Sequence, residues 1–212
     1  TVLSVDLLGN DPLNISPNPA SDVYLDNSIG ILLVRAETEE ELSEIDSITI
    51  RGAAGESAII ALGPFCALRN LALVENVGSN AATIIQCSIE SSIVARNHVS
   101  AKGAVQVRTS TIVDTVFENN ISRQGGAIFI HPADSVYVVR SVFYNNRSED
   151  GGAIFSSGTD LVIVSSSFIA NVADCAGGAI VMDENGSLTS VNNVYLYNSS
   201  LASCLGIKDG GA

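Results

Sequence analysis

The segment "DGGAIFSSGTDLVIVSSSFIAN", residues 150–171, decides the fold because close copies of it stand on both sides. Its first phrase, Gly-Gly-Ala, begins at Gly125, Gly151, Gly177 and Gly210, with a weaker relative at Gly103. Its second phrase, apolar-x-[Ser/Thr/Asn]-x-[Phe/Tyr]-x-x-Asn, occurs as "VDTVFENN" (113–120), "VRSVFYNN" (139–146), "VSSSFIAN" (164–171) and "VNNVYLYN" (191–198). The closing asparagines are 26, 25 and 27 positions apart, which indicates a structural repeat.

A unit of this length is too short to bury a hydrophobic face alone, so successive units must stack. Fainter copies end at Asn76 and Asn97, and "DSITIRG" (46–52) resembles an opening strand. We therefore predict an all-β solenoid of about six to seven coils, each of roughly 21 to 27 residues. The alternative, a β-sandwich of short strands, would not repeat a phrase in register.

Equivalent side chains of successive coils are expected to form columns. Strand alternation in "VRSVFYNN" places Val139, Ser141 and Phe143 on one face. Two continuous interior stacks follow, one of valines (Val113, Val139, Val164 and Val191) and one of aromatic residues (Phe117, Phe143, Phe168 and Tyr195).

The glycine pairs and the closing asparagines have separate physical reasons. A glycine pair fits a turn that needs a positive φ or a close approach of two backbones. Asparagine tolerates the left-handed region, and its amide can bond to the asparagine of the next coil. We expect a ladder of Asn120, Asn146, Asn171 and Asn198.

Residues 1–45 are expected to form an N-terminal cap or an irregular first coil. Here "NDPLNISPNPASD" is rich in Pro and Asn, "TEEELSEID" is acidic, and such segments cover the open end of a solenoid. Thr38 and Glu41 have the spacing of a capping box, which predicts one helical turn. Residues 46–212 are expected to form the β-helix, which we expect to continue beyond the last residue because the chain stops within a copy of the phrase.

Composition argues against two classes of partner. The apolar fraction of 46% suffices for a core, and the net charge of −13 would repel a nucleic-acid backbone or an anionic membrane. No apolar run reaches the roughly 18 residues that a membrane span needs. We therefore expect no nucleic-acid binding and no direct membrane insertion of this segment.

The pairing of "GGAI" with "F-x-x-N" resembles the repeats of the polymorphic outer membrane proteins of chlamydial autotransporters, from Gly103 to Ala212. The resemblance implies a right-handed, single-stranded parallel β-helix displayed outside the cell, in adhesion or as a surface scaffold. The upstream coils, "DSITIRGAAGESAII" especially, look more like the generic pectate-lyase-type β-helix.

The four cysteines fall at related positions of the repeat. Cys66 and Cys87 each lie ten residues before a closing Asn, which places their Cα atoms about 5 Å apart, within disulfide reach. Cys175 and Cys204 lie four and six residues after a closing Asn, a looser alignment. We expect both pairs to be disulfides, with four buried thiols as the alternative. Disulfides would indicate an extracellular or cell-surface location.

Asn-x-Ser sequons predict a glycoprotein, with candidate acceptors at Asn14, Asn120, Asn146, Asn185 and Asn198. Asn185, in the turn "DENGS", is the best acceptor. Three of the others hold ladder positions, where the side chain can point inward.

A carbohydrate-binding or carbohydrate-cleaving β-helix, lyase-like or hydrolase-like, is the alternative function. Asp114 and Arg140 hold the same outward position on adjacent coils, and Asp134 and Asp160 share a turn approximately. Stacked acids of this kind can bind calcium or a sugar. Otherwise Asp114 and Arg140 form an outward salt bridge and the turn acids are solvated, which we favour.

The strong motifs are explained by stacking. His98 and His131 are isolated in the sequence and are expected to be solvated loop residues, and no cofactor motif occurs. We predict a non-catalytic structural or adhesive segment of a larger surface, fibre or matrix glycoprotein. Its expected partners are other copies of itself, other surface or matrix proteins, and glycans. No cofactor is expected apart from calcium at the alternative site.

Overall fold

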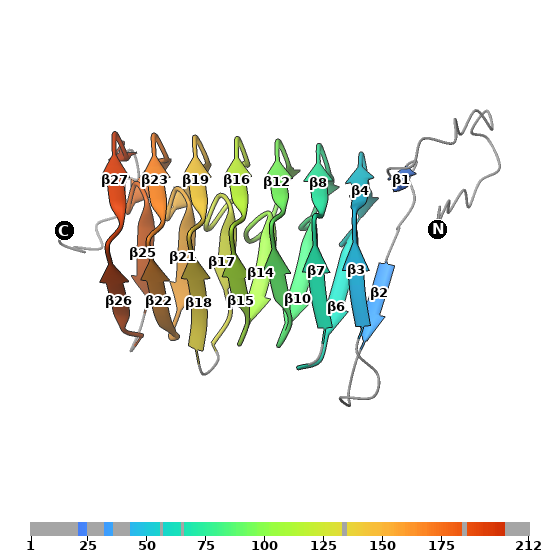
Figure 1. Ribbon diagram of the computed structural model, residues 1–212. Helices are drawn as coiled ribbons and strands as arrows, with labels where there is room; N and C mark the ends of the chain where they lie inside the picture. The colour runs from blue at the N-terminus through green and yellow to red at the C-terminus, as the bar shows by residue number, and fades with distance from the viewer. Residues whose placement is uncertain are drawn as a thin grey trace.

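The computed structural model of the chain describes residues 21–24, 32–35, 43–55, 57–64, 66–132, 135–183 and 186–201. Within these ranges the protein is all-β, without a helix, and its strands wind into a parallel β-solenoid of about six turns. The coils follow one another along a single axis (Figure 1).

Three long parallel sheets form the walls of the solenoid, and nearly every coil contributes one strand to each. Sheet A comprises β1 (Ser21–Tyr24), β4 (Ile48–Arg51), β8 (Ala72–Val74), β12 (Ile93–Ala95), β16 (Val116–Glu118), β19 (Val142–Tyr144), β23 (Ser167–Ile169) and β27 (Val194–Leu196). Sheet B comprises β2 (Leu32–Arg35), β6 (Ile59–Leu62), β10 (Ala82–Ile85), β14 (Val105–Arg108), β17 (Ile128–Ile130), β21 (Ile154–Ser157) and β25 (Ile180–Asp183). Sheet C comprises β3 (Ser43–Asp46), β7 (Cys66–Arg69), β11 (Ser88–Glu90), β15 (Thr111–Val113), β18 (Ser135–Val139), β22 (Asp160–Val164) and β26 (Leu188–Val191).

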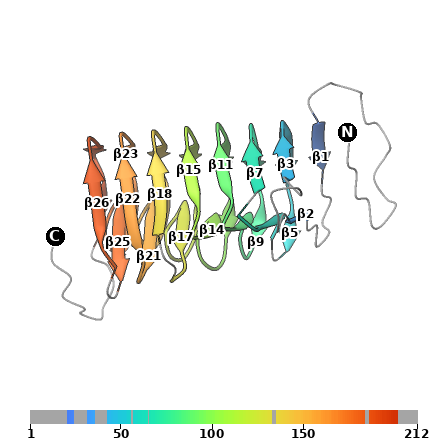
Figure 2. The ribbon, with the colours of Figure 1, turned by 60° about the horizontal axis from the view of Figure 1, so that its bottom comes forward.

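Short strands complete most coils between sheet A and sheet B. One small sheet contains β5 (Ala54–Gly55), β9 (Val77–Gly78) and β13 (His98–Val99). The other contains β20 (Arg147–Asp150), β24 (Val172–Ala176) and β28 (Ser199–Ser200). Bridges of Ile121 to His98 and to Arg147 join the two along the axis. Each coil therefore runs through sheets B, C and A in that order, and sheets B and C appear as separate rows in Figure 2.

Residues with positive φ form the corners between the sheets. From sheet C to sheet A, the turn is made by Ser47, Asn70, Ser91, Asp114, Arg140, Ser165 and Asn192. A residue in this conformation interrupts the alternation of the strand, so the inward and outward positions are reset after every corner.

The corner residues overturn the prediction of an interior valine stack. Val113, Val139, Val164 and Val191 are in register, but they face outward; the first three are half-buried and Val191 is 50% exposed. The buried positions belong to the residues that precede them in the chain: Ile112, Val138 and Ile163. Val139 therefore does not share a face with Ser141 and Phe143, because Arg140, with a φ of 47°, lies between them.

The first described strands, within residues 21–46, continue the stacks of the solenoid. β1 pairs with β4, β2 with β6 and β3 with β7, all in parallel. The helical turn expected at Thr38–Glu41 lies outside the described residues.

Candidate functional site

A ladder of asparagines runs through six successive coils between sheet A and the short strands. Its members are Asn76, Asn97, Asn120, Asn146, Asn171 and Asn198, of which the first five are buried. The side-chain amide of each of the first five donates to the Oδ1 atom of the next asparagine at 2.8–3.0 Å. Each backbone N–H donates to the same oxygen at 2.9–3.1 Å.

The second amide proton of each ladder residue is also used. Asn146 donates to the carbonyl oxygen of Phe117 at 3.0 Å, and Asn171 to that of Phe143 at 2.9 Å. An interior asparagine of the ladder thus donates twice and accepts twice, so its amide carries no unmet hydrogen bond.

The left-handed conformation, however, belongs to the residue before each ladder asparagine. Asn119, Asn145 and Ala170 have φ values of 55°, 53° and 55°, whereas no ladder asparagine has a positive φ. The prediction that the ladder residues exploit the left-handed region is therefore wrong. Their position selects asparagine because its amide both donates and accepts along the axis.

A second polar ladder lies at the start of sheet A, and the sequence reasoning assigned it no role. The Oγ atom of Ser92 accepts from the N–H of Leu71, that of Ser141 from Thr115, and that of Ser166 from Ser141, at 3.0–3.2 Å. Each hydroxyl also donates to the carbonyl two residues earlier in the chain; Ser141 donates to Val139 at 3.0 Å. The signal was present as the third position of the repeat phrase, where Ser, Thr or Asn recurs.

The aromatic residues form one column within sheet A. Phe117, Phe143, Phe168 and Tyr195 are in register, and their ring centroids are 4.6–5.0 Å apart with interplanar angles of 10° or less. Toward the N-terminus the same column continues as Val94, Leu73 and Ile50. The phenylalanines are fully buried, so this column supplies packing and no exposed chemistry.

The two glycines of each pair answer overlapping steric demands. The first, Gly125, Gly151 or Gly177, has a φ of 60–64°. The second passes close to the next coil: a Cβ at Gly152 would lie 2.8 Å from the backbone nitrogen of Val172 and would meet the carbonyl oxygen of Gly178. Both reasons given for the pair therefore apply: the first glycine has the positive φ, and both glycines lie close to backbone atoms, since a Cβ at Gly151 would also meet the carbonyl oxygen of Ile154.

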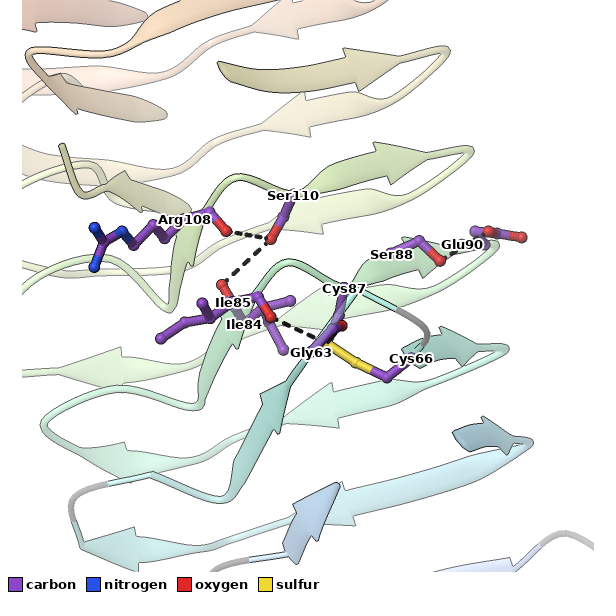
Figure 3. Close-up of a disulfide and its surroundings, with 9 residues drawn as sticks. All are labelled: Gly63, Cys66, Ile84, Ile85, Cys87, Ser88, Glu90, Arg108 and Ser110. Carbon is purple, nitrogen blue, oxygen red and sulfur yellow. Dashed lines mark hydrogen bonds between the residues drawn. A yellow bond between two sulfur atoms is a disulfide. The ribbon is translucent and has the colours of Figure 1, made fainter. Parts of the chain in front are cut away.

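The Cys66–Cys87 pair is a disulfide at the corner between sheets B and C (Figure 3). The two Cα atoms are 4.9 Å apart, and both side chains are buried. Cys175 is also disulfide-bonded, whereas Cys204, its predicted partner, lies outside the described residues. No cysteine in the described part of the chain is a free thiol.

Two of the five sequons are blocked by the ladder. Asn120 and Asn146 have no exposed surface, and both amide protons of each are donated within the solenoid. Glycosylation at these two residues would require the folded coils to open. Asn198 is half-buried and donates to the carbonyl of Phe168 at 2.8 Å, and Asn14 and Asn185 lie outside the described residues.

The alternative carbohydrate or calcium site does not form one cluster among its described members. Asp114 and Arg140 lie after the last residues of β15 and β18, whereas Asp160 begins β22 and is aligned with Ser135. Asp160 is thus separated from the Asp114 row by the length of a strand, about 16 Å. It accepts hydrogen bonds from the hydroxyl and N–H of Ser187, and Asp134 lies outside the described residues. In the described part of the chain, no three His, Cys, Asp or Glu side chains gather into a group that could hold a metal ion.

Charged side chains on the N-terminal coils form rows of alternating sign. In one row Glu75 contacts Arg51 at 2.6 Å and Arg96 at 3.1 Å, and Arg96 also approaches Glu118 at 3.8 Å. In the other, Arg69 lies between Glu44 and Glu90. The hydrogen bonds from Arg51 and Arg96 lower the pKa of the Glu75 carboxyl group.

Asp114 and Arg140 form an exposed pair without a third charged partner among the described residues. Arg140 donates two hydrogen bonds to the Asp114 carboxylate, at 2.7 and 2.8 Å. These bonds lower the pKa of Asp114 and raise the pKa of Arg140. The pair therefore has the geometry of an outward salt bridge.

A shallow depression of about 440 Å³ lies on the outer face of sheet B. Its lining residues are Thr83, Ile84, Ile85, Gln106, Val107, Arg108, His131 and Pro132. His131 is half-buried, packs edge-on against Phe129 at a centroid distance of 4.9 Å, and its Nε2 lies 2.7 Å from Gln106 Oε1. The expectation of a solvated residue is wrong for His131, while His98 is exposed.

Comparison with known proteins links two segments of the chain to one family. Residues 114–131 and 140–157 match the model of the Chlamydia polymorphic membrane protein repeat. Each segment contains one "F-x-x-N" phrase and the "GGAI" phrase that follows it, so the predicted resemblance to this repeat is confirmed. No curated protein and no solved structure gave a significant match. Within the described residues, no helix has the length and apolar character needed to cross a membrane.

Proposed function

We propose that this chain is a non-catalytic structural or adhesive segment of a larger surface protein, located outside the cell. The observation that carries the proposal is the use of the repeated residues. The ladder asparagines apart from the half-buried Asn198, the ladder serines and the phenylalanines are buried and bonded or packed along the axis. The side chains that recur in each repeat unit thereby hold the coils together.

Two further observations support a surface role. The matched repeats are those of membrane proteins of Chlamydia. The Cys66–Cys87 disulfide and the second disulfide-bonded cysteine, Cys175, suit an oxidising compartment, because disulfides persist outside the reducing cytosol. Stacked coils with a rise of about 4.8 Å each make a stiff spacer whose length grows with the number of repeats.

An assay of polysaccharide turnover tests the non-catalytic part of the proposal. The purified chain is incubated with pectin and alginate panels, with and without calcium, and the release of reducing or unsaturated ends is measured. We expect no turnover. Turnover that disappears in Asp114→Ala or Asp160→Ala would overturn the proposal in favour of a polysaccharide lyase or hydrolase.

Mass spectrometry of the native protein tests the location. We expect Cys66 and Cys87 in one cross-linked peptide pair, with any N-linked glycan on a residue other than Asn120 or Asn146. Free thiols at Cys66 and Cys87 in native material would contradict an extracellular location.

A further inference from the structure

The depression on sheet B combines residues from three successive coils. Thr83 of β10 is in register with Gln106 of β14, and Ile85 with Arg108, so these side chains form two adjacent outward columns. His131, which follows β17, bonds through its N–H to the carbonyl of Val107 and so lies beside Arg108. Because neighbouring coils are about 4.8 Å apart, the polar groups of the depression lie within reach of one small ligand.

Arg108 differs from the other arginines around it. Among the arginines whose side chains the structure describes, six form an ion pair with a carboxylate: Arg51, Arg69, Arg96, Arg123, Arg140 and Arg147. Arg108 has no such partner in this part of the chain, and in Figure 3 its side chain extends away from the Cys66–Cys87 disulfide.

A second cation lies near the depression without lining it. The Lys102 ammonium lies 4.3 Å from the ring centroid of Phe129, whose edge contacts His131, and no carboxylate among the described residues pairs with it. The pKa of His131 is lowered by burial first, and then by the charges of Lys102 and Arg108. A local positive field therefore exists on a chain whose net charge is −13.

We propose that this depression binds an acidic saccharide, with Arg108 contacting its carboxylate or sulfate group. A guanidinium presents a planar fork of donors that matches such groups. Thr83, Gln106 and His131 supply neutral hydrogen-bonding groups for hydroxyls, and Ile85 and Pro132 supply apolar surface for a ring face. Several neutral polar groups and an apolar floor beside one strong charge favour a sugar over an acidic peptide, because a sugar presents hydroxyls and a ring face together with its acidic group.

The inference adds a ligand to the proposed surface role and rests on that role only for bringing saccharides within reach. Binding of the chain to polygalacturonate, heparin, neutral dextran and poly-glutamate is measured by calorimetry at low and physiological salt. We expect binding to polygalacturonate or heparin and none to dextran. The two acidic polymers separate a carboxylate from a sulfate as the group recognised.

Arg108→Gln is the test variant, and Arg123→Gln is its matched control. Both residues are exposed, but Arg123 is paired with Glu149 at 3.2 Å and is not among the residues that line the depression. We expect at least a tenfold loss of affinity for Arg108→Gln, with the affinity unchanged for Arg123→Gln and unfolding curves superimposable for both. Gln106→Ala, which removes a neutral contact, is expected to weaken binding less.

Three results would overturn the inference: no binding to either acidic polymer, equal weakening by the two arginine variants, or poly-glutamate bound as tightly as the saccharides. Any of them leaves the non-catalytic surface role intact, because that role is tested by turnover. Cleavage of the bound polymer would instead contradict the proposed function.

Discussion

The N-terminal coils, residues 43–108, and the C-terminal coils, residues 111–201, build the same solenoid with different side chains. The N-terminal coils carry the Cys66–Cys87 disulfide, rows of ion pairs and an aliphatic column. The C-terminal coils carry glycine pairs and stacked aromatic rings. The asparagine ladder passes through both without interruption. Parallel strand pairing and the asparagine ladder are therefore common to both regions, whereas the side chains that fill the interior and form the corners differ between them.

The glycine pair marks a difference in corner length. Lys102 bridges to Gln124, and Val105 is in register with Ile128, so the C-terminal corner holds three residues where Gly103 and Ala104 make up the N-terminal one. The longer corner accompanies the change from Val94 to Phe117 in the interior column. An added corner residue lengthens the coil, and a longer coil has room for the larger ring.

The largest effect should come from breaking the tight corner. Gly152→Ala is expected to destabilise the protein by about 4 kcal/mol or more, because the new Cβ would meet backbone atoms of the next coil, which cannot move aside. Gly52→Ala is the control in the N-terminal coils: Gly52 has a positive φ, of 70°, which Gly152 lacks, and nothing lies within 4 Å of its Cβ position. That variant should lose only about 1–2 kcal/mol. Urea unfolding measures both, and equal losses would show that the close approach does not constrain the corner.

Removal of a ladder asparagine should destabilise the protein equally in the N-terminal and in the C-terminal coils. Asn146→Ala leaves the amide and backbone N–H of Asn120 without their acceptor, and Asn97→Ala does the same to Asn76. Because each buried unsatisfied group costs about 1–3 kcal/mol, both variants should lose about 3 kcal/mol or more in urea unfolding. Asn145→Gly, at an exposed position with a positive φ, should change stability by less than about 1 kcal/mol. A clearly smaller loss at Asn97 would mean that the disulfide and ion pairs substitute for the ladder.

The aromatic and asparagine columns could be predicted from the sequence because each repeat phrase has the same residue type at the same position. Phe143 and Asn146 fall at fixed positions of the phrase, and the disulfide followed from the equal distances of Cys66 and Cys87 from a closing Asn. The outward orientation of the valines could not be predicted from the sequence, because the corner residues that reset the alternation, such as Asp114 and Arg140, share no residue type.

The depression on sheet B was hidden for a different reason. Thr83, Gln106, Arg108 and His131 come from three coils and repeat no phrase, so only the register of the strands shows that they are neighbours. That Arg108 has no carboxylate partner among the described residues is likewise a property of the stacked coils, since the sequence alone does not show which acids approach which arginines.

The disulfide should stabilise the N-terminal coils selectively. It links residues 21 positions apart, for which restriction of the unfolded chain is worth about 3 kcal/mol. Replacing both cysteines, Cys66→Ala with Cys87→Ala, should reduce stability by roughly this amount. Hydrogen exchange should show the loss at β7 and β11, with the protection of β19 and β23 retained. Equal loss of protection along the whole axis would show instead that all coils unfold as one unit.

The smallest expected effect concerns carboxyl pKa values, and it distinguishes the Asp114–Arg140 pair from the row of charges that contains Glu75. Arg140 is the partner that lowers the pKa of Asp114, whereas both Arg51 and Arg96 lower the pKa of Glu75. Arg140→Gln should therefore return the pKa of Asp114 to its ordinary value of 3.8, while Arg51→Gln should raise that of Glu75 only part of the way to 4.5.

A depressed carboxyl pKa contributes stability above the ordinary pKa, and that contribution is lost as the pH falls through the lowered value. Both variants should therefore have the same stability as the unmodified protein below that pH. Above it they should be less stable, and only slightly, because the charged groups are exposed. Carboxyl carbon chemical shifts followed by NMR across the acid range measure both values, and a full return of Glu75 to its ordinary pKa would show that Arg96 takes no part in the row.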